Sequence, residues 1–480
     1  MNTQFNDFPY QVFRAYDIRG KVELLNAQVI AAIAHAFAQK FKSNGQTQIV
    51  LGYDARLTGP HYAQIMHDIL VQDFEVIDIG CCSSPQLYYI ARQYQGNGIM
   101  ITASHNPKSD NGVKWIVQNQ PPSPEDIQQI ASCAQSFYPT CTAQYCQASL
   151  NPAQHLPHQF RPDRYRAYIE SLCQDIQLQR PLKVVLDGLN GSAGTTAEIL
   201  LKQLNCEVIA IRCEANGHFP DHAPDPSQAI HLNLIREQVR LHSADLGIAL
   251  DGDGDRVVLI DEQGNIISAD RLLALLAQMC LLHKPSGEIV FDVKCSSMVR
   301  RSIEALGGKA KMIRTGSSFL RQYMAKSKGQ AIFGGEYAGH YVFNDGRGFC
   351  YDDGLYAALR VMEYLSQFPN KTLSELLAAY PERFYTEDTY ISTHNVNPHL
   401  VLSEIASSSQ KFNAALSKID GVRLDFDHGF GIIRASNTGD FFTVRFDADT
   451  ASDLNQIRHH FVSMLCDRYP LIAQDIINTQ

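Results

Sequence analysis

Apolar, β-branched runs alternate with helical patterns along the chain up to about residue 375. Three of these runs are alike, because each passes into an aspartate-containing turn and is followed by a helical pattern: Ile49–Leu51, Val184–Leu186 and Ile289–Phe291. This alternation predicts parallel strands joined by crossover helices, as in α/β domains. The clearest predicted helices are Asn26–Phe41, Arg164–Asp175, Ala269–Leu282, Ser297–Leu306 and Gly354–Phe368.

Each of the three repeats offers a second apolar run that ends in a polar loop: Ile99–Ser104, Gly247–Asp253 and Ala331–Glu336. The pattern therefore predicts a degenerate internal repeat of three related α/β domains with mixed sheets. Two stretches rich in proline, glutamine and serine interrupt it. We interpret Gln118–Pro124 as a loop and Ser149–Pro162 as a linker between domains.

The pattern changes after about residue 376. Val422–Phe426, Gly431–Arg434 and Phe441–Phe446 alternate as short antiparallel strands, and Ala451–Tyr469 has the pattern of an amphipathic helix. A fourth domain of α+β type is therefore expected. The predicted boundaries are 1–155, 156–263, 264–375 and 376–480.

Composition excludes several classes of protein. The 480 residues are 45% hydrophobic and 19% charged, which is typical of globular chains, and the net charge of -9 argues against nucleic acid or an anionic membrane as a partner. No secretory signal and no membrane-spanning run is visible, and the 12 cysteines have no zinc-binding spacing. We expect a cytoplasmic protein with reduced thiols.

The sharpest chemical signal is Asp251-Gly252-Asp253-Gly254-Asp255-Arg256, which follows the apolar run Leu246–Leu250. Three carboxylates on alternate residues repel one another unless a cation neutralises them. An EF-hand loop is disfavoured, because Arg256 stands where that turn needs glycine and a strand enters the loop. A Mg²⁺ site open toward a phosphate is favoured over a solvated acidic turn.

Ser104 follows a predicted strand and precedes His105-Asn106-Pro107. Alone, such a serine is most often a turn or cap residue. A Ser–His pair for acyl transfer is a second interpretation, but no nucleophile-elbow motif surrounds it, and neighbouring side chains point apart in extended backbone. Lys114, the aspartates and several arginines instead favour phosphoryl transfer.

Two further loops have the composition of recognition elements. Gly334–His340 offers Glu336 and His340 in a glycine-rich backbone, which suits either a sugar or a plain tight turn. Arg434–Gly439 offers an arginine, two hydroxyls and backbone amides, which suits either a phosphate or an ordinary hairpin loop. Gly188–Gly194 has GxxGxxG spacing and is interpreted as a strand-to-helix turn rather than a dinucleotide site.

Taken in order, these loops resemble the α-D-phosphohexomutase superfamily, in particular its bacterial phosphomannomutase/phosphoglucomutase group. The matching motifs span nearly the whole chain: Phe13–Gly20, Thr102–Pro107, Asp251–Arg256, Gly335–His340 and Arg434–Thr438. The resemblance implies three similar α/β domains and a fourth domain around a central cleft. It also implies reversible transfer between the 1- and 6-positions of mannose and glucose phosphates through a phosphoserine and a hexose 1,6-bisphosphate.

The resemblance implies a role for each matched residue. Ser104 would carry the phosphate and bind Mg²⁺ with Asp251, Asp253 and Asp255, while Arg19, His105, Lys114 and Arg256 would surround the transferring group. Substrate contacts would come from Tyr16, Lys294, Glu336, Ala338, His340, Arg434, Ser436, Asn437 and Thr438. Ser317, Ala338 and Gly439-Asp440 depart from the family pattern and leave the sugar preference open.

We therefore expect an isomerase whose partners are small hexose phosphates, acting as a monomer or weak homodimer. Two alternatives stay open. A phosphoglucosamine mutase is disfavoured by the start Phe13–Gly20. A non-catalytic phosphosugar- or Ca²⁺-binding protein on the same fold is disfavoured by the intact serine and aspartates.

Overall fold

The computed structural model describes residues 8–15, 17–141, 161–436 and 439–479. The chain packs as two compact units. Unit 1 holds Met1–Ile267, Arg321–Lys326 and Ala338–Leu376, and unit 2 holds Ser268–Leu320, Ser327–Tyr337 and Leu377–Gln480. The four domain ranges predicted from sequence remain a prediction. Each unit is described by itself.

The first sheet of unit 1 has the strand order β1-β5-β4-β2-β3. β2 runs parallel to β3 and β4, whereas β5 runs antiparallel to β4 and β1. The strands are β1 Ile18–Lys21, β2 Gln48–Tyr53, β3 Glu75–Cys81, β4 Gly98–Ile101 and β5 Asp110–Ile116. Their helices are α1 Ala27–Ser43, α2 Gly59–Leu70, α3 Ser84–Ala91 and α4 Pro124–Phe137.

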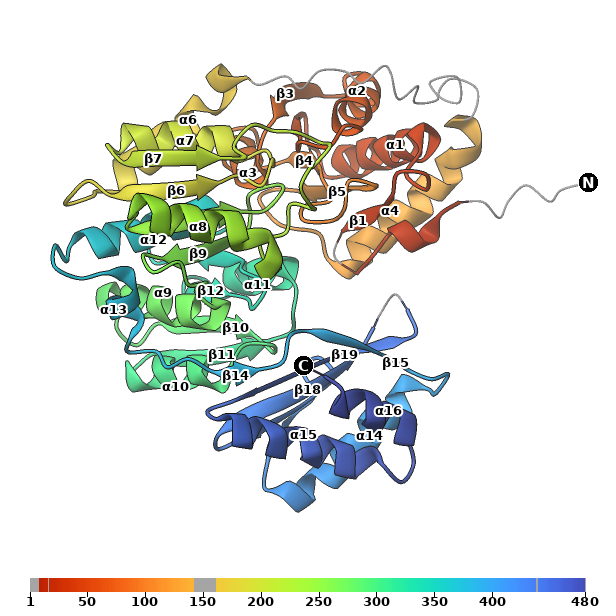
Figure 1. Cartoon of the computed structure of the whole chain (residues 1–480). Coiled ribbons are helices and arrows are strands. Elements are labelled where there is room, and N and C mark those ends of the chain that lie inside the picture. The colour runs from red at the N-terminus through yellow and green to blue at the C-terminus, as the bar shows by residue number, and fades with distance from the viewer. Residues whose placement is uncertain (1–7, 16, 142–160, 437–438, 480) are drawn as a thin grey trace, which may run out of the picture. The chain divides into compact units, whose positions relative to one another are not determined.

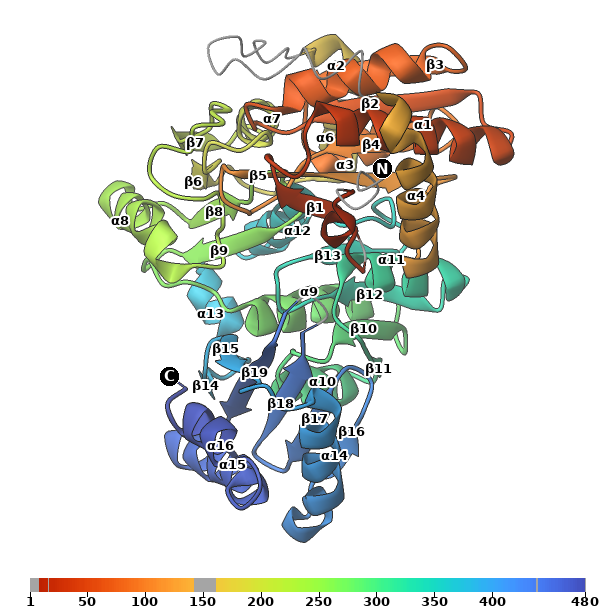
Figure 2. The same cartoon turned by 90° about the vertical axis from the view of Figure 1, so that its right-hand side faces the viewer.

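Helices cover both faces of this sheet. Along β2, Ile49 and Leu51 belong to the core that contains α1, α2 and α4, whereas Val50 belongs to the core that contains α3. Figures 1 and 2 show α1 lying between α2 and α4. This alternation is what a parallel strand buried on both faces requires, and it confirms the predicted α/β pattern.

The second sheet of unit 1 repeats the arrangement in the order β7-β6-β8-β9. β6 is parallel to β7 and β8, and β9 is antiparallel to β8. The strands are β6 Lys183–Asp187, β7 Glu207–Ile211, β8 Leu246–Leu250 and β9 Val257–Asp261. The remaining elements of unit 1 are α6 Pro162–Asp175, α7 Gly194–Gln203, α8 Asn233–His242, β13 Tyr341–Phe343 and α12 Gly354–Ser366. α13 Leu373–Leu377 ends one residue into unit 2.

Unit 2 contains a third parallel set and an antiparallel sheet. β10 lies between β11 and β12, and the strands are β10 Glu288–Asp292, β11 Lys309–Ile313 and β12 Ala331–Gly335. The helices of this part are α9 Ala269–His283 and α10 Ser297–Ala305, and α11 Ser317–Lys326 is shared between the units. The order β3-β2-β4, β7-β6-β8 and β11-β10-β12 confirms the predicted internal repeat.

The C-terminal sheet is antiparallel, as predicted. Its strands are β14 Phe384–Tyr385, β15 Thr389–Ser392, β16 Ala415–Ser417, β17 Val422–Phe426, β18 Gly429–Ala435 and β19 Phe441–Ala448. Figure 2 shows α14 Pro398–Ser408, α15 Ala451–Leu465 and α16 Pro470–Ile477 beside these strands, and their apolar residues share one core with them.

One predicted boundary was wrong. The closing helix ends at Leu465 rather than Tyr469, because Tyr469 precedes Pro470 and has extended φ of -133, and Pro470 begins a separate helix. The strands that lead into the polar loops at Ser104 and Asp253 end at Ile101 and Leu250, which confirms the predicted passage from apolar run to polar loop. The predicted loop 118–124 is confirmed up to Ser123, and the predicted linker 149–162 lies mostly outside the described residues.

Candidate active site

Ser104 lies in the loop that follows β4, with φ of 53 and 1% exposure. Its Oγ donates to Asp251 Oδ2 at 2.5 Å and lies 3.1 Å from His105 Nδ1. The expectation that the serine and histidine side chains point apart was wrong. It assumed extended backbone, and the left-handed conformation of Ser104 turns the two side chains toward each other.

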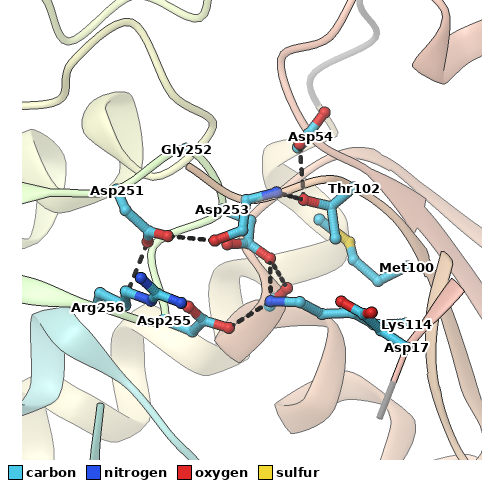
Figure 3. Close-up of polar contacts among 12 residues, drawn as sticks. Asp17, Asp54, Met100, Thr102, Lys114, Asp251, Gly252, Asp253, Asp255 and Arg256 are labelled. Carbon is cyan, nitrogen blue, oxygen red and sulfur yellow. Dashed lines mark hydrogen bonds and ion pairs between the residues drawn. The ribbon is translucent and has the colours of Figure 1, made fainter. Parts of the chain in front are cut away.

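The aspartate loop joins β8 to β9, so a strand leads in and a strand leads out, which rules out the helical entry of an EF-hand. Asp251, Asp253 and Asp255 are each at most 1% exposed, and each offers an oxygen within 4.8 Å of the others. The backbone N–H of Arg256 donates to Asp251 Oδ1 at 3.2 Å. Figure 3 shows the triad gathered on one side of this loop.

Lys114 projects from β5 onto the same carboxylates. Its Nζ lies 2.8 Å from Asp253 Oδ2 and 2.5 Å from Asp255 Oδ2, and Figure 3 shows both contacts. Burial opposes the charged ammonium, but the two carboxylates outweigh it and hold the pKa of Lys114 well above its usual range. Lys114 is therefore a fixed positive charge beside the triad.

One ammonium does not balance three buried carboxylates. Burial, together with Asp255 and Asp253, raises the pKa of Asp251 to about 8. Burial also acts on Asp255, but the Lys114 ammonium lowers its pKa below the ordinary value. Within the described part of the chain, Asp253 Oδ1 and Asp255 Oδ1 are buried without a hydrogen-bond partner. Orphaned carboxylate oxygens are the ligands that a hard divalent cation takes, so the triad fits a metal ion.

Arg256 and His340 form the next layer. Arg256 Nε donates to His340 Nε2 at 2.9 Å, and His340 Nδ1 lies 3.0 Å from Asp352 Oδ2 and 3.6 Å from Asp255 Oδ1. Because Nε2 accepts from Arg256, the ring proton belongs on Nδ1, facing Asp352. This contact fixes the plane of the Arg256 guanidinium beside the triad.

His105 and Arg19 flank the serine loop. Burial and the neighbouring Arg256 and Arg19 charges hold the pKa of His105 well below its usual value, so its imidazole is neutral at pH 7. Arg19 pairs with Asp17 at 2.7 Å and donates to Asn106 Oδ1 at 3.1 Å. Unit 1 thus brings together Ser104, His105, Lys114, Arg19, Asp251, Asp253, Asp255, Arg256 and His340.

Unit 2 contains Lys294, Glu336, Arg434 and Ser436 of the other predicted residues. Glu336 is 1% exposed, and its Oε1 accepts from Gly316 N–H at 2.5 Å. Lys294 Nζ pairs with Asp388 Oδ2 at 2.5 Å, and despite burial, Asp388 and Asp292 raise its pKa. Asp292 also accepts from the backbone of Tyr337, which ties the Lys294 and Glu336 loops together.

The remaining predicted residues are less clustered. Arg434 pairs with Asp420 at 2.7 Å, and Ser436 Oγ accepts from Gly439 N–H at 3.1 Å. Ala338 is half-buried in unit 1. Tyr16, Asn437 and Thr438 lie outside the described residues.

Sequence analysis missed several buried polar residues around the serine. Ser84, at the start of α3, donates to Asp253 Oδ2 at 2.6 Å, and Asp54 and Arg56 follow β2 and contact the serine loop. A signal was present, because β2, β6 and β10 each reach an aspartate at the same edge of their sheets: Asp54, Asp187 and Asp292. Their partners, however, are distant in sequence.

Three family models match the chain. They are described as the α/β/α domains I, II and III of phosphoglucomutase/phosphomannomutase and match residues 10–138, 163–264 and 268–384. A Pseudomonas syringae pv. tomato protein named phosphomannomutase/phosphoglucomutase is 37% identical over 94% of each chain. A Neisseria gonorrhoeae protein named phosphoglucomutase is 35% identical over 95% of this chain and 96% of its own.

A solved structure agrees with these matches. The phosphoglucomutase/phosphomannomutase family protein from Burkholderia thailandensis superposes with a TM-score of 0.84 and 30% identity, covering 96% of this chain and 98% of that one. Among the described residues, no helix has both the length and the apolar content to cross a membrane.

Proposed function

The chain belongs to the phosphoglucomutase/phosphomannomutase family, and from this membership we propose that it moves a phosphoryl group reversibly between the 1- and 6-positions of hexose phosphates. Its substrates are mannose and glucose phosphates, and it works through a phosphoserine enzyme and a hexose 1,6-bisphosphate. The observation that carries this proposal is the buried Ser104 hydroxyl, 2.5 Å from Asp251 within the triad and beside Lys114.

Ser104, Asp251, Asp253 and Asp255 would hold Mg²⁺, which fits the orphaned oxygens of Asp253 and Asp255. Bound there, Mg²⁺ supplies positive charge that offsets the charge of the transferring phosphoryl group. The protein itself supplies the cations Lys114, Arg256 and Arg19. Phosphoryl transfer needs positioning and charge stabilisation above all, and the contacts of these side chains hold them in place.

In the forward step, the bond between phosphorus and Ser104 Oγ breaks as a new bond forms to the free hydroxyl of the hexose monophosphate. The hydroxyl proton passes to a base in the site. His105 suits this role, because its Nδ1 lies 3.1 Å from Ser104 Oγ and its imidazole is neutral, whereas the raised pKa of Lys114 keeps that residue charged. The bisphosphate then turns over, and its other phosphate returns to Ser104 Oγ.

The substrate contacts in unit 2 are part of the same proposal. Glu336 would accept from sugar hydroxyls, Lys294 would lie near them, and Arg434 and Ser436 would bind the phosphate that does not react. A carboxylate that binds hydroxyls common to glucose and mannose makes no contact with the 2-position, where the two sugars differ. Acceptance of both sugars follows from this arrangement.

The test replaces Ser104 with alanine. Conversion of mannose 1-phosphate and glucose 1-phosphate to the 6-phosphates, with catalytic bisphosphate present, should fall by at least about 10⁴-fold, as expected for loss of a covalent nucleophile. Ser109→Ala, in the same loop but exposed, is the control and should retain activity. Intact mass should show one phosphate on the wild type and none on Ser104→Ala.

Full turnover by Ser104→Ala would overturn the proposal. A parallel assay on glucosamine 1-phosphate separates the two mutase activities, because a phosphoglucosamine mutase would convert the amino sugar faster than either hexose. A wild-type protein that binds hexose phosphates but converts none of them would be a non-catalytic binding protein.

A further inference from the structure

Arg56 is a buried arginine whose donors converge on the serine loop. It follows β2 and is 1% exposed. Its Nε donates to Asp54 Oδ2 at 3.2 Å. One terminal nitrogen donates to the carbonyls of Pro107 and Asp110 at 2.7 and 2.8 Å, and the other donates to the carbonyls of Ser104 and Asn106 at 2.8 and 2.6 Å. Every N–H of the guanidinium is therefore used.

Four main-chain carbonyls, three from the serine loop and that of Asp110 at the start of β5, thus meet a single planar cation. Within the loop, Asp110 N–H also donates to the Pro107 carbonyl at 3.0 Å. Ser104 is held at φ of 53, where a residue with a side chain is strained. A strained residue keeps its conformation only when its surroundings fix it. The Arg56 fork bonds the Ser104 carbonyl and three carbonyls beyond it.

Asp54 supplies a second connection to the same residue. Its Oδ2 accepts from Thr102 Oγ1 at 2.7 Å, and Thr102 Oγ1 in turn accepts from Ser104 N–H at 2.8 Å. Figure 3 shows Asp54 pointing at Thr102 beside the triad. The peptide N–H and the carbonyl of Ser104 are therefore both fixed by the Asp54–Arg56 pair, the first through Thr102 and the second directly.

The aspartate loop packs against the carbonyl that Arg56 holds. A Cβ on Gly252 would lie 2.3 Å from the Ser104 carbonyl oxygen, so the two loops touch through their backbones. The Arg56 guanidinium also lies 5.5 Å from the centre of the Phe219 ring, which belongs to the segment between β7 and α8. Arg56 therefore lies where the serine loop meets the aspartate loop.

We propose that Arg56 is a positioning residue for phosphoryl transfer: by bonding the carbonyls of Ser104, Asn106, Pro107 and Asp110, it sets the direction in which Ser104 Oγ meets the aspartate triad. The inference rests on the proposed function of Ser104. Arg56 touches neither the hydroxyl nor a substrate and acts through the main chain of the loop. Its removal affects the rate of transfer, while the groups that bind the sugar phosphate stay in place.

Lysine cannot replace this arginine. An ammonium keeps the charge and the long apolar stem, but it is a point donor without the planar fork that reaches four carbonyls at once. Arg56→Lys therefore keeps the positive charge and removes the planar arrangement of donors. The matched control is Arg347→Lys, because Arg347 lies in the same unit and also bonds through its whole fork, but only to Asp175 and Glu363.

The experiment compares the two variants with the wild type in steady-state mutase assays and by hydrogen exchange. Arg56→Lys should lower kcat by at least about 100-fold with KM changed by less than about threefold, because misplacing a reacting group mainly costs rate. Amides of residues 102–111 should exchange faster in this variant alone. Arg347→Lys should keep its kcat within about twofold of the wild type.

A loss of kcat no larger than that of Arg347→Lys, or unchanged exchange in residues 102–111, would overturn the inference. The proposed function fails separately, through an inactive wild type or an active Ser104→Ala. If Arg56→Lys does not fold, Asp54→Asn and Thr102→Val test the second connection. Each of these two variants should lower kcat with a smaller change in KM and speed amide exchange at Ser104. If kcat is unaltered in both variants, the inference is overturned.

Discussion

At the scale of single residues, the buried carboxylates of the aspartate triad need positive charges beside them. Lys114 faces the same carboxylates that would hold a divalent cation, since its Nζ lies 2.8 and 2.5 Å from Asp253 and Asp255. Removing one partner of a buried ion pair leaves the other charges unbalanced. The stability of the protein should therefore depend on how many cations face the triad.

We expect Lys114→Gln to be inactive and less stable than the wild type in metal-free buffer, by about 3–5 kcal/mol. Added Mg²⁺ should raise its unfolding midpoint more than that of the wild type, because binding to the folded state stabilises it and the carboxylates are less compensated. The measurement is thermal unfolding in EDTA and across a Mg²⁺ titration. Lys40→Gln, which breaks a pair with Asp126 away from the triad, is the control. Equal Mg²⁺ shifts in both variants would contradict this account.

The sequence alone was enough to predict the site residues that form an unusual local motif. Three aspartates in a glycine-rich loop, and a serine beside a histidine, stand out without any structure. Arg56, Ser84 and Asp352 do not, because a single buried arginine, serine or aspartate becomes informative only through its partner. Those partners are distant: Ser84 meets Asp253, 169 positions further along the chain.

At the scale of elements, the apolar pattern predicted the strands and helices but not the backbone conformation of the loops that follow the strands. The strands that lead to Ser104 and Asp253 end at Ile101 and Leu250, where the predicted polar loops begin. Hydrophobic pattern does not record backbone angle, and the chain leaves the sheet through Ser104 at φ 53 and Gly254 at φ 74. The loops that follow β4 and β8 therefore determine where the site residues lie.

The contact between the two loop backbones predicts that Gly252→Ala is harmful. Its Cβ would lie 2.3 Å from the Ser104 carbonyl and 2.9 Å from Pro224, and Arg56 holds that carbonyl in place. We expect a loss of about 1–3 kcal/mol in stability and a lower kcat. Steady-state kinetics and denaturant unfolding check this. Gly59→Ala, whose Cβ would find no atom nearer than 3.3 Å, should be tolerated, and equal behaviour of the two variants would refute the steric argument.

The start of α12 predicts a pH dependence. Asp353 caps this helix by accepting from Tyr356 N–H and also accepts from the Tyr168 hydroxyl, yet burial raises its pKa from 3.8 to about 7. A raised carboxyl pKa favours folding at low pH, and that stability is lost as the pH rises from about 4 to 7, at up to ~1.4 kcal/mol per pH unit.

Asp353→Asn removes this titration while keeping an oxygen for the cap. The unfolding midpoint of Asp353→Asn, relative to that of the wild type, should therefore rise between about pH 4 and pH 7 and level off above pH 7. Thermal unfolding of both proteins across this range tests the sign, because the other titrating groups are common to both. A difference that is constant with pH would show that Asp353 has the same charge in the folded and unfolded chains.

At the scale of the whole molecule, the chain order does not follow the packing. Unit 2 combines Ser268–Leu320 and Ser327–Tyr337 with Leu377–Gln480, while the residues between and before them belong to unit 1. Buried contacts join the two main parts of unit 2: Phe430 and Ile432 of β18 pack on Val293, and Arg445 pairs with Asp270. The contacts described above for the serine and aspartate loops, by contrast, come from residues of unit 1.

We therefore expect the two units to respond separately to core truncation. Phe430→Ala, at a fully buried position, should cost about 3–5 kcal/mol and speed amide exchange in β10 and β18, while β4 and β8 keep their protection. Phe37→Ala, in the core of unit 1 against Trp115, should produce the opposite pattern. Exchange that rises equally in both units after either substitution would show one cooperative structure. In that case, damage at the C-terminal sheet would reach Ser104 and the aspartate loop as well.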